Sequence, residues 1–448
     1  MNRLLALIDG EHYPPVIESA LAEIRRGGDH IVGAVFLGGT EKVLENEALT
    51  MLGCPIVRDE NFLSAIRKAA GRYQPDAVVD LSDEPVVGYR ERFEIASLVL
   101  SLGLKYVGAD FEFEAPTLEK IGQKPAMSII GTGKRVGKTA ISAYACRELK
   151  KAGFNPGVVA MGRGGPQKPE VIDGAKIKID PEYLLGQARQ GRHAASDHFE
   201  DALMSRILTV GCRRCGGGLA GQPFVSNVKE GAIIANSLDT DFTIFEGSGA
   251  AIPPIETETR VVVTGANQPM EYIVGYLGSY RLLISDLVVL TNCEKDMDVS
   301  RIAELIEHIK KIKVGLGVVK TIFRPQPLED ISGKKVFFTT TAPESANVVV
   351  NKYLESNFGV QVVGISNHLS NRSLLREDIM DNRGRFDTLL TELKAAAVDV
   401  VTEIGVELDK QVVYCDNIPV LVGEGSLADS LISLAKEAQT KFKEHNGG

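Results

Sequence analysis

Apolar runs of strand length alternate with amphipathic stretches along most of the chain. The runs are rich in Val, Ile and Leu, and the stretches between them repeat apolar residues at the three- to four-residue spacing of a helix. Strands buried on both faces of a parallel sheet show continuous apolar runs of this kind. The pattern therefore predicts an α/β protein with parallel sheets. Strands are expected at 4–8, 31–37, 77–81, 127–130, 157–161, 242–245, 260–264, 287–291, 316–322 and 335–339, and helices include 15–26, 61–72, 139–152 and 299–311.

Two interruptions of this pattern divide the chain into three units. The stretch "APTLEKIGQKP" breaks the alternation with Gly and Pro, and "TTTAPESANVVVNKYLE" opens a segment of mixed helices and strands. The predicted units are an N-terminal Rossmann-like domain at 1–124, a central domain at 125–345 and a smaller C-terminal α/β segment at 346–448.

The segment "SIIGTGKRVGKTAISAYACRELKKAG" ends a predicted strand in a Gly- and Lys-rich turn and continues as a helix. Exposed backbone N–H groups at such a helix N-terminus bind phosphate. Lys138 is expected to contact the β- and γ-phosphates of ATP, and the Thr139 hydroxyl is expected to hold Mg²⁺. The segment therefore predicts a P-loop formed by Gly131, Thr132, Gly133, Lys134, Arg135, Val136, Gly137, Lys138 and Thr139.

The spacing of this loop differs from the common P-loop pattern. The position five residues before Gly137 is Thr132, and the glycine stands one residue earlier, at Gly131. The loop resembles that of dethiobiotin synthetase and its relatives in the deviant P-loop group, which has the same length and the same Gly-Thr opening. Lys134 and Arg135 within the loop are expected to stabilise charge on the transferring phosphate.

Polar residues at three predicted strand ends extend this candidate site. Glu246 ends a strand in "FEGSGAAIPPI", where a P-loop enzyme places a carboxylate that binds Mg²⁺ or orders water. Asn292 ends a further strand, and an Asn there commonly contacts adenine in this fold group. Asp173 follows the strand after the P-loop helix and is a candidate for an extra Mg²⁺ ligand.

The composition restricts the partners of the chain. With 50 basic and 59 acidic residues the net charge is −9, so general binding to nucleic acid or to a membrane surface is not expected. Local basic pockets remain available, and Arg suits bidentate binding of phosphate. Arg163 joins Lys138, Lys134 and Glu246 as a candidate catalytic residue, because its Gly-Arg-Gly-Gly setting lets the backbone approach a ligand closely. The candidate substrate-binding residues are Arg163, Arg189, Arg192, His193, Arg372 and Arg383.

The six cysteines are too sparse for a disulfide framework, which indicates a reducing cytosol. Cys212 and Cys215 form a lone Cys-x-x-Cys, and a zinc site needs a second pair that does not stand at suitable spacing. No apolar run approaches the roughly 20 residues of a membrane helix. The expectation is a cytoplasmic protein without a metal at these cysteines.

Three motifs together, "MSIIGTGKRVGKTAISAYA", "MGRGGPQKPEVI" and "EGSGAAIPPI", resemble the cyclic 2,3-diphosphoglycerate synthetase family, and the resemblance covers essentially the whole chain. It implies that ATP and 2,3-diphosphoglycerate are converted to cyclic 2,3-diphosphoglycerate, ADP and phosphate. In this chemistry a substrate phosphate accepts the γ-phosphoryl group, and the second phosphate of the same molecule then closes the ring. The N-terminal domain is a candidate substrate-binding unit because α/β sheets bind ligands at a topological switch point, and the C-terminal segment is expected to complete the site.

Two other functions remain open at this point. A dethiobiotin synthetase-like ligase that activates a carbamate or carboxylate would need a less cationic pocket, and it gives the two outer units no obvious task. A nucleotide-switch partitioning ATPase typically has a signature Lys five residues before the P-loop Lys, where this chain has Gly133. Related proteins often build their site near a two-fold axis, so a homodimer is expected by analogy of fold.

Overall fold

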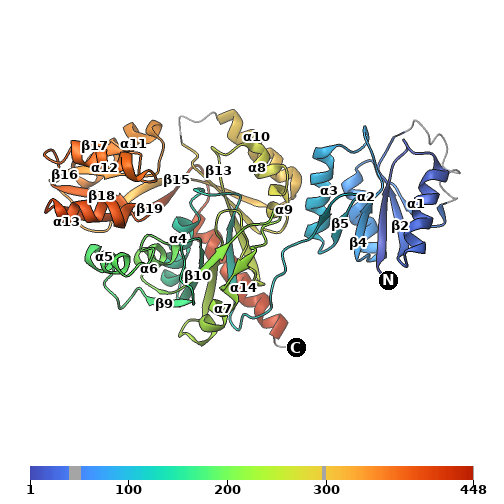
Figure 1. Cartoon of the computed structure of the whole chain (residues 1–448), viewed down its shortest axis with the longest axis horizontal. Helices are drawn as coiled ribbons and strands as arrows, with labels where there is room; N and C mark the ends of the chain where they lie inside the picture. The colour runs from blue at the N-terminus through green and yellow to red at the C-terminus, as the bar shows by residue number, and fades with distance from the viewer. Residues whose placement is uncertain (40–51, 295–298, 447–448) are drawn as a thin grey trace.

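The structure is a computed structural model that describes residues 1–39, 52–294 and 299–446. A small N-terminal domain lies at one end of the molecule, and a larger body holds the P-loop domain and the C-terminal unit (Figure 1). The C-terminal unit lies at the end farthest from the N-terminal domain. The α/β class predicted from the sequence is confirmed.

The N-terminal domain is a six-stranded sheet in the order β3-β2-β1-β4-β5-β6, parallel except for β6. Its order reverses at β1, so the ends of β1 and β4 form a switch point. The domain contacts the body where the Ser97 hydroxyl donates to the Tyr276 carbonyl at 3.0 Å. Its elements are β1 (Arg3–Ile8), α1 (Pro14–Arg26), β2 (His30–Phe36), β3 (Ile56–Val57), α2 (Phe62–Tyr73), β4 (Ala77–Asp80), α3 (Tyr89–Ser101), β5 (Lys105–Val107) and β6 (Glu112–Phe113).

The P-loop domain supplies the parallel part of a 13-stranded sheet, in the order β10-β8-β12-β7-β13-β14-β15 with β11 at the edge and β9 paired to β10. Its strands are β7 (Ala126–Gly131), β8 (Pro156–Gly162), β9 (Glu170–Asp173), β10 (Leu208–Cys215), β11 (Val225–Ser226), β12 (Phe242–Glu246), β13 (Thr259–Gly265), β14 (Leu287–Thr291) and β15 (Gly317–Pro327). Its helices are α4 (Lys138–Lys151), α5 (Pro181–Arg189), α6 (Asp197–Ser205), α7 (Val228–Ser237), α8 (Met270–Val274), α9 (Gly278–Leu283) and α10 (Val299–Ile312).

Two long strands join the P-loop domain to the C-terminal unit. The first half of β15 pairs with β14, and its second half pairs antiparallel with β19, which continues into the C-terminal strands. The sheet therefore runs without a break into the order β15-β19-β18-β16-β17. The remaining elements are β16 (Lys335–Thr339), η2 (Glu344–Ala346), α11 (Asn347–Phe358), β17 (Gln361–Ser366), α12 (Arg372–Asp381), β18 (Thr388–Glu392), η3 (Ala397–Thr402), α13 (Glu403–Glu407), β19 (Gln411–Leu421) and α14 (Leu427–Asn446).

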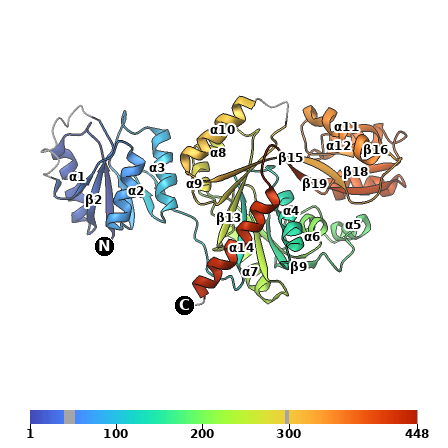
Figure 2. The same cartoon turned by 180° about the vertical axis from the view of Figure 1, so that it is seen from behind.

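The last helix returns to the P-loop domain, as the view from behind shows (Figure 2). Leu431 and Ala435 of α14 pack in one core with Ile141 and Leu149 of α4. Full burial of a leucine side chain contributes about 1.5–3 kcal/mol, so α14 helps to hold the helix that follows the P-loop.

The strand and helix positions predicted from the apolar pattern are confirmed, with β15 longer than expected. The boundary between the second and third units differs from the predicted 345/346. β16 pairs with β17 and β18, so this unit begins before residue 335, and α14 belongs spatially to the P-loop domain. Within the described residues, no helix is long and apolar enough to cross a membrane.

Candidate active site

The P-loop connects the end of β7 to the start of α4 at the carboxyl edge of the parallel sheet. Arg135 and Gly137 have left-handed backbone conformations, with φ of 63° and 90°. A Cβ atom on residue 137 would stand 2.2 Å from the Phe323 ring of β15, so this turn requires glycine. Thr132, in place of the usual glycine, bonds through its hydroxyl to Thr264 at 2.9 Å and so fixes the loop to β13.

Lys138 lies buried at the base of this loop and its Nζ donates to the Gly133 carbonyl at 2.9 Å. Burial lowers the pKa of Lys138 to about 8, and the Glu246 carboxylate opposes that shift. The ammonium group therefore sits in a poorly solvated site, where a phosphate is a stronger partner than a peptide carbonyl.

Glu246 ends β12 beside the P-loop and is 2% exposed. The Thr139 hydroxyl donates to its Oε1 at 2.7 Å, and the Glu246 carboxyl group also hydrogen-bonds with that of Asp201. Burial raises the pKa of Glu246 to about 7. A buried carboxylate without a cationic partner is costly, and this one lies beside the hydroxyl that a P-loop enzyme uses for Mg²⁺.

Helix α6 adds three carboxyl groups that the sequence analysis did not select: Asp197, Glu200 and Asp201. Their spacing places them on one helix face, which turns toward Glu246. Asp201 is fully buried and receives no donor from a backbone or basic group within the part of the chain that the structure describes, and its carboxyl group hydrogen-bonds with that of Glu246. Burial, followed by the neighbouring Glu246, raises the pKa of Asp201 well above its usual range. Burial also raises the pKa of Glu200, to about 8.

Two arginines meet over the Glu-Gly-Ser-Gly turn that follows Glu246. A Cβ atom on Gly249 would stand 2.6 Å from Arg163 Nη2 and 3.1 Å from Arg214 Nη2. Arg214 also donates to the Ser248 carbonyl at 2.7 Å. Arg163 and Arg214 both act on Lys138 electrostatically, so three cations converge beside the P-loop.

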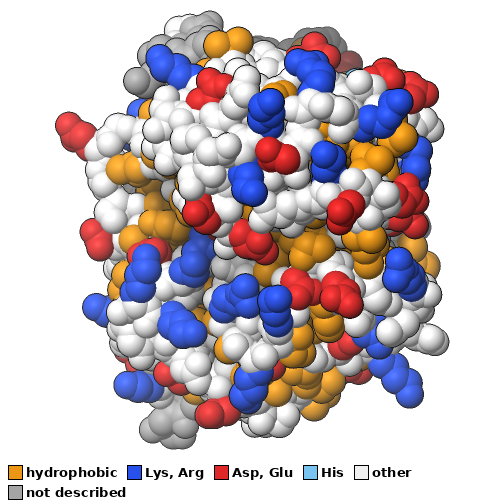
Figure 3. Space-filling view, turned by 90° about the vertical axis from the view of Figure 1, so that its left-hand side faces the viewer, with side chains coloured by type: hydrophobic (Ala, Val, Ile, Leu, Met, Phe, Trp, Pro, Cys, Tyr) orange, Lys and Arg blue, Asp and Glu red, His pale blue; other side chains and the backbone are white. Residues whose placement is uncertain are grey.

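A cavity of about 960 Å³ opens in front of these groups. The P-loop domain lines it with Lys134, Arg135, Lys138, Thr139, Arg163, His193, Asp197, Glu200 and Glu246. The C-terminal unit closes the other side with residues 340–346, Asn367, His368, Glu392, Lys394 and Asn417. The outer face at this end of the molecule carries interspersed basic and acidic side chains rather than a field of one sign (Figure 3).

One part of the cavity is formed by the loops after β13 and β14. Asn292, in a left-handed conformation with φ of 57°, donates to Asn267 Oδ1 at 3.2 Å. Phe323 and an Arg324–Glu294 ion pair of 2.6 Å complete this part. An aromatic ring with amide groups beside it is suited to a base, and the contact of Asn292 with adenine stays a prediction.

Comparison with known proteins bears on the whole chain. Three domain profiles of one family match in succession: "Cyclic 2,3-diphosphoglycerate synthetase, N-terminal domain" at 3–114, its P-loop domain at 126–322 and its C-terminal domain at 327–418. The chain belongs to the cyclic 2,3-diphosphoglycerate synthetase family.

Relatives that carry this family name match over nearly their full length. The proteins from Rubrobacter xylanophilus and Methanothermus fervidus are each 52% identical; the alignments cover 97% and 99% of this chain and 98% of each relative. The protein from Methanothermobacter thermautotrophicus is 48% identical, over 98% of this chain and 97% of its own. A solved structure of LpxK from Aquifex aeolicus in complex with ATP aligns at 15% identity and a TM-score of 0.41, covering 71% of this chain and 90% of that one.

Several residues predicted for the site of this synthetase-family chain lie outside the cavity. Asp173 forms an ion pair of 2.9 Å with Lys176 at the end of β9, so it is not placed to hold a metal beside Thr139. Arg192 pairs with Glu170 at 2.6 Å, and Arg372 pairs with Asp399. Arg189 is exposed on α5, and Arg383 is exposed with its Nη1 on the Met380 carbonyl. These arginines were selected for their density in sequence, which does not show the direction of a side chain.

Cys212 and Cys215 point to opposite faces of β10, because they are three residues apart on a strand. Cys212 is buried, and burial raises its pKa to about 12, whereas Cys215 is exposed. The two thiols are therefore not arranged to share one ligand.

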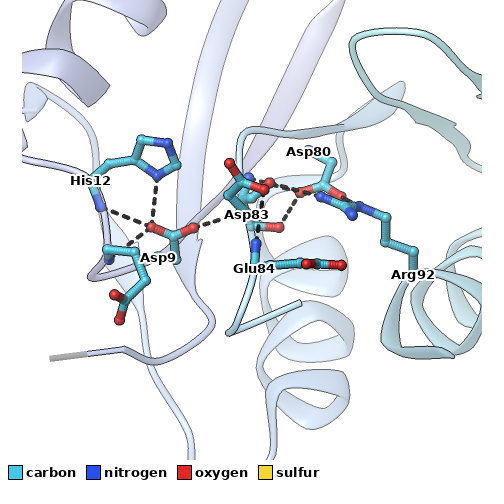
Figure 4. Close-up of polar contacts among 8 residues, drawn as sticks. Asp9, His12, Asp80, Asp83, Glu84 and Arg92 are labelled. Carbon is cyan, nitrogen blue, oxygen red and sulfur yellow. Dashed lines mark hydrogen bonds and ion pairs between the residues drawn. The ribbon is translucent and has the colours of Figure 1, made fainter. Parts of the chain in front are cut away.

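The switch point of the N-terminal domain also carries buried carboxylates (Figure 4). Asp9 accepts bonds from Glu11 N, His12 N, His12 Nδ1 and Asp83 N at 2.7–3.2 Å. Asp80 accepts from Ser82, from Arg92 Nε at 3.2 Å and from the Tyr106 hydroxyl at 2.6 Å. Donors from the adjoining loops, from α3 and from β5 satisfy these carboxylates, which therefore tie the strand ends to the rest of the domain.

Proposed function

We propose that the chain catalyses the ATP-dependent cyclisation of 2,3-diphosphoglycerate, releasing ADP and phosphate. The observation that carries this proposal is the cavity, in which a P-loop Lys and Thr share one space with cationic side chains from two structural units. Its volume of about 960 Å³ is at the upper end of small-molecule sites, which suits two ligands bound side by side. The names of relatives that match over nearly the full chain support the same reaction.

The reaction requires two displacements at phosphorus. An oxygen of one substrate phosphate attacks the γ-phosphorus of ATP, and the bond to ADP breaks as ADP leaves with the electron pair. An oxygen of the second substrate phosphate then attacks the first phosphorus, and inorganic phosphate leaves with the bridging oxygen and, at neutral pH, takes up one proton. No water enters and no enzyme nucleophile is needed, so catalysis is positioning and charge stabilisation.

The charges of the two ligands explain the cations of the site. Substrate carries about five negative charges and ATP about four, and two unit charges 4 Å apart repel by about 4 kcal/mol at an effective dielectric of 20. Lys138, Lys134 and Arg135 are proposed to contact the ATP phosphates, and Arg163 with His193 to contact the substrate. Asn292 is proposed to contact the base. Arg214, which the sequence analysis did not select, is added to the substrate side because it converges with Arg163.

Magnesium fits the donors present at the P-loop. The Thr139 hydroxyl and the Glu246 carboxylate would hold the ion, and the observation that favours it is the buried pair of Glu246 and Asp201, which has no ion pair with a basic side chain among the described residues. Within the described residues no three His, Cys, Asp or Glu side chains form a metal site alone, so phosphates and water would complete the coordination. A bound Mg²⁺ neutralises charge on the transferring phosphoryl group.

The proposal also includes a cytoplasmic homodimer, which rests on the cysteine usage and on analogy of fold. Size-exclusion chromatography with light scattering measures the mass of the particle. A mass near 48.4 kDa would mean a monomer, and twice that mass a dimer.

Phosphorus NMR of the protein with Mg-ATP and 2,3-diphosphoglycerate tests the reaction. Wild-type protein is expected to produce new upfield anhydride resonances that depend on ATP. Lys138→Ala is expected to abolish them, whereas Lys150→Ala, an exposed lysine on the same helix, is expected to keep them. ATP hydrolysis by the wild type without ring resonances would contradict the proposed function and favour a different P-loop activity.

A further inference from the structure

We propose that Lys394, from the C-terminal unit, holds the substrate phosphate that closes the ring. This inference rests on the proposed function and assigns one step of it to a residue far from the P-loop in sequence. The two substrate phosphates have different tasks, so they need different surroundings. One accepts the γ-phosphoryl group, and the other attacks the first and becomes the second half of the ring anhydride.

The order of the phosphates in the cavity follows from the chemistry of in-line displacement. The attacking and leaving oxygens lie on opposite sides of the phosphorus under attack. In the ring-closing step the leaving group is the former γ-phosphate, which lies beside Lys138 and Thr139. The attacking phosphate must therefore lie on the far side of the accepting phosphate, away from the P-loop. The wall of the cavity that does not belong to the P-loop domain is the C-terminal unit.

Lys394 is the lysine that this wall presents to the cavity within the described residues. It is the second residue after β18, and its Nζ lies 3.3 Å from Glu200 Oε1 of α6, so it reaches across from one unit to the other. Asp197, at the start of α6, interacts electrostatically with both Lys138 and Lys394. The two lysines therefore face a common region of the cavity from opposite units.

Other polar groups line the cavity on the same wall as Lys394, among them the Glu392 carboxylate and the His368 imidazole, of which the imidazole is suited to an anion. His368 lines the cavity with its Nδ1 held by Asp378 at 2.8 Å, which leaves Nε2 for a ligand. Asn367 and Asn417 also line the cavity, where the Asn367 amide donates to the Ala342 carbonyl and to Asn347, and the Asn417 amide donates to Glu392 at 3.1 Å. Lys394 is a compact point charge with three rotatable donors, which suits a phosphate that moves during ring closure better than a fixed arginine fork does.

The first experiment uses Lys394→Met in the full-length protein, with Lys352→Met as the matched control. Lys352 is an exposed lysine of the same unit on α11, outside the residues that line the cavity. Cyclic product and ADP are both quantified by phosphorus NMR, and KM is measured for 2,3-diphosphoglycerate and for ATP. Wild type and Lys352→Met are expected to give one ring per ADP.

Lys394→Met is expected to raise KM for 2,3-diphosphoglycerate by about 10- to 100-fold, the usual effect of losing a charge-assisted hydrogen bond. The KM for ATP is expected to change far less. The number of rings per ADP is also expected to fall, because the phosphorylated intermediate is hydrolysed when the attacking phosphate is misplaced. A merely structural role would lower total turnover but would leave both the stoichiometry and the KM for 2,3-diphosphoglycerate unchanged, and that result would overturn the inference.

Removal of Lys394 alone leaves the Glu200 carboxyl without its partner, which can destabilise the fold. The double variant Glu200→Gln/Lys394→Met removes both groups together and is measured in the same way, with Lys394→Arg as the variant that keeps the charge. A ring-to-ADP ratio that recovers in Lys394→Arg supports the inference. A ratio in the double variant equal to that of the wild type contradicts it. Absence of ring formation by the wild type would contradict the proposed function itself, so the two failures are distinguishable.

Discussion

Two parallel sheets in this chain place buried carboxylates at their carboxyl edges, but only the N-terminal edge supplies them with backbone and basic donors within the described residues. In the N-terminal domain, Asp9 and Asp80 accept hydrogen bonds on both carboxylate oxygens, from loop backbone and, for Asp80, from Arg92 of α3 and Tyr106 of β5. Beside the P-loop, Glu246 bonds to Asp201 and to the Thr139 hydroxyl, and neither carboxyl group receives a backbone or basic donor among the residues that the structure describes. A carboxylate that has all its donors stabilises a fold, whereas one that lacks them is prepared for a ligand.

The cations differ in the same way. Arg92 in the N-terminal domain bonds to Asp80 and to the Ser82 carbonyl, so it is used inside its own domain. Lys138 has only a peptide carbonyl as its hydrogen-bond partner within the described residues, although it is buried. By topology alone, both edges are candidate binding sites. The P-loop edge is the better candidate because its buried charged groups lack the hydrogen-bond partners that those of the N-terminal edge have.

The largest predicted effect is that of a substitution at Glu246, on the P-loop edge. Glu246→Gln keeps the shape of the side chain but removes the charge that would hold Mg²⁺ with Thr139. We expect turnover to fall by about 10²–10³-fold, the range seen when one electrostatic stabiliser is removed from an active site. Turnover is measured over a titration of Mg²⁺. Glu256→Gln, at an exposed carboxylate, is the control, and equal turnover in the two variants would contradict a role in metal binding.

An intermediate effect is predicted at the N-terminal edge, and it concerns stability instead of catalysis. Asp9→Ala removes the acceptor of four hydrogen bonds and leaves buried donors unsatisfied, which costs about 1–3 kcal/mol for each group left without water or a partner. Urea unfolding is expected to shift to lower concentrations, while the KM for ATP remains unchanged. If Asp9→Ala had wild-type stability and a raised KM for ATP, the N-terminal edge would be a ligand-binding site, which would contradict the prediction.

The smallest predicted effect is on the pH dependence of stability. Burial raises the pKa of Glu200 to about 8 and that of Glu246 to about 7, so the folded protein binds more protons than the unfolded chain above the ordinary carboxyl pKa. Stability of the ligand-free protein therefore falls as pH rises toward 8. We expect Tm to drop by several degrees between pH 6 and pH 8, since each kcal/mol lost lowers Tm by about 2–4 °C for a domain of this size. Glu246→Gln should reduce the change of Tm with pH. An unchanged dependence of Tm on pH would contradict the contribution assigned to Glu246.

The P-loop domain was predictable from sequence because its signals are local. The strand, the Gly-rich turn and the helix around Lys138 are contiguous, and Glu246 directly follows an apolar run. Lys394 and the α6 carboxylates were missed because their importance depends on contacts across a large sequence separation, such as that between Glu200 and Lys394. The spacing of Asp197, Glu200 and Asp201 on one helix face was the available signal.

The arginines predicted to bind substrate show an error of the opposite kind, because residues were selected that lie outside the cavity. Arg372 and Arg192 stand in basic stretches, but each pairs with an acidic residue on the surface. Local charge density does not reveal such partners. The continuous sheet through β15 and β19 was also not predictable, because the antiparallel pairing of two long strands joins units that are separate in the apolar pattern.

The most direct test of the central claim follows an oxygen atom. 2,3-Diphosphoglycerate labelled with ¹⁸O in its non-bridging phosphate oxygens is converted with unlabelled Mg-ATP in unlabelled water, and the released inorganic phosphate is analysed by mass spectrometry. Transfer of the γ-phosphoryl group to substrate, followed by ring closure, predicts one labelled oxygen in each inorganic phosphate. Inorganic phosphate without a substrate oxygen would mean that ATP is hydrolysed by water, and it would contradict the account.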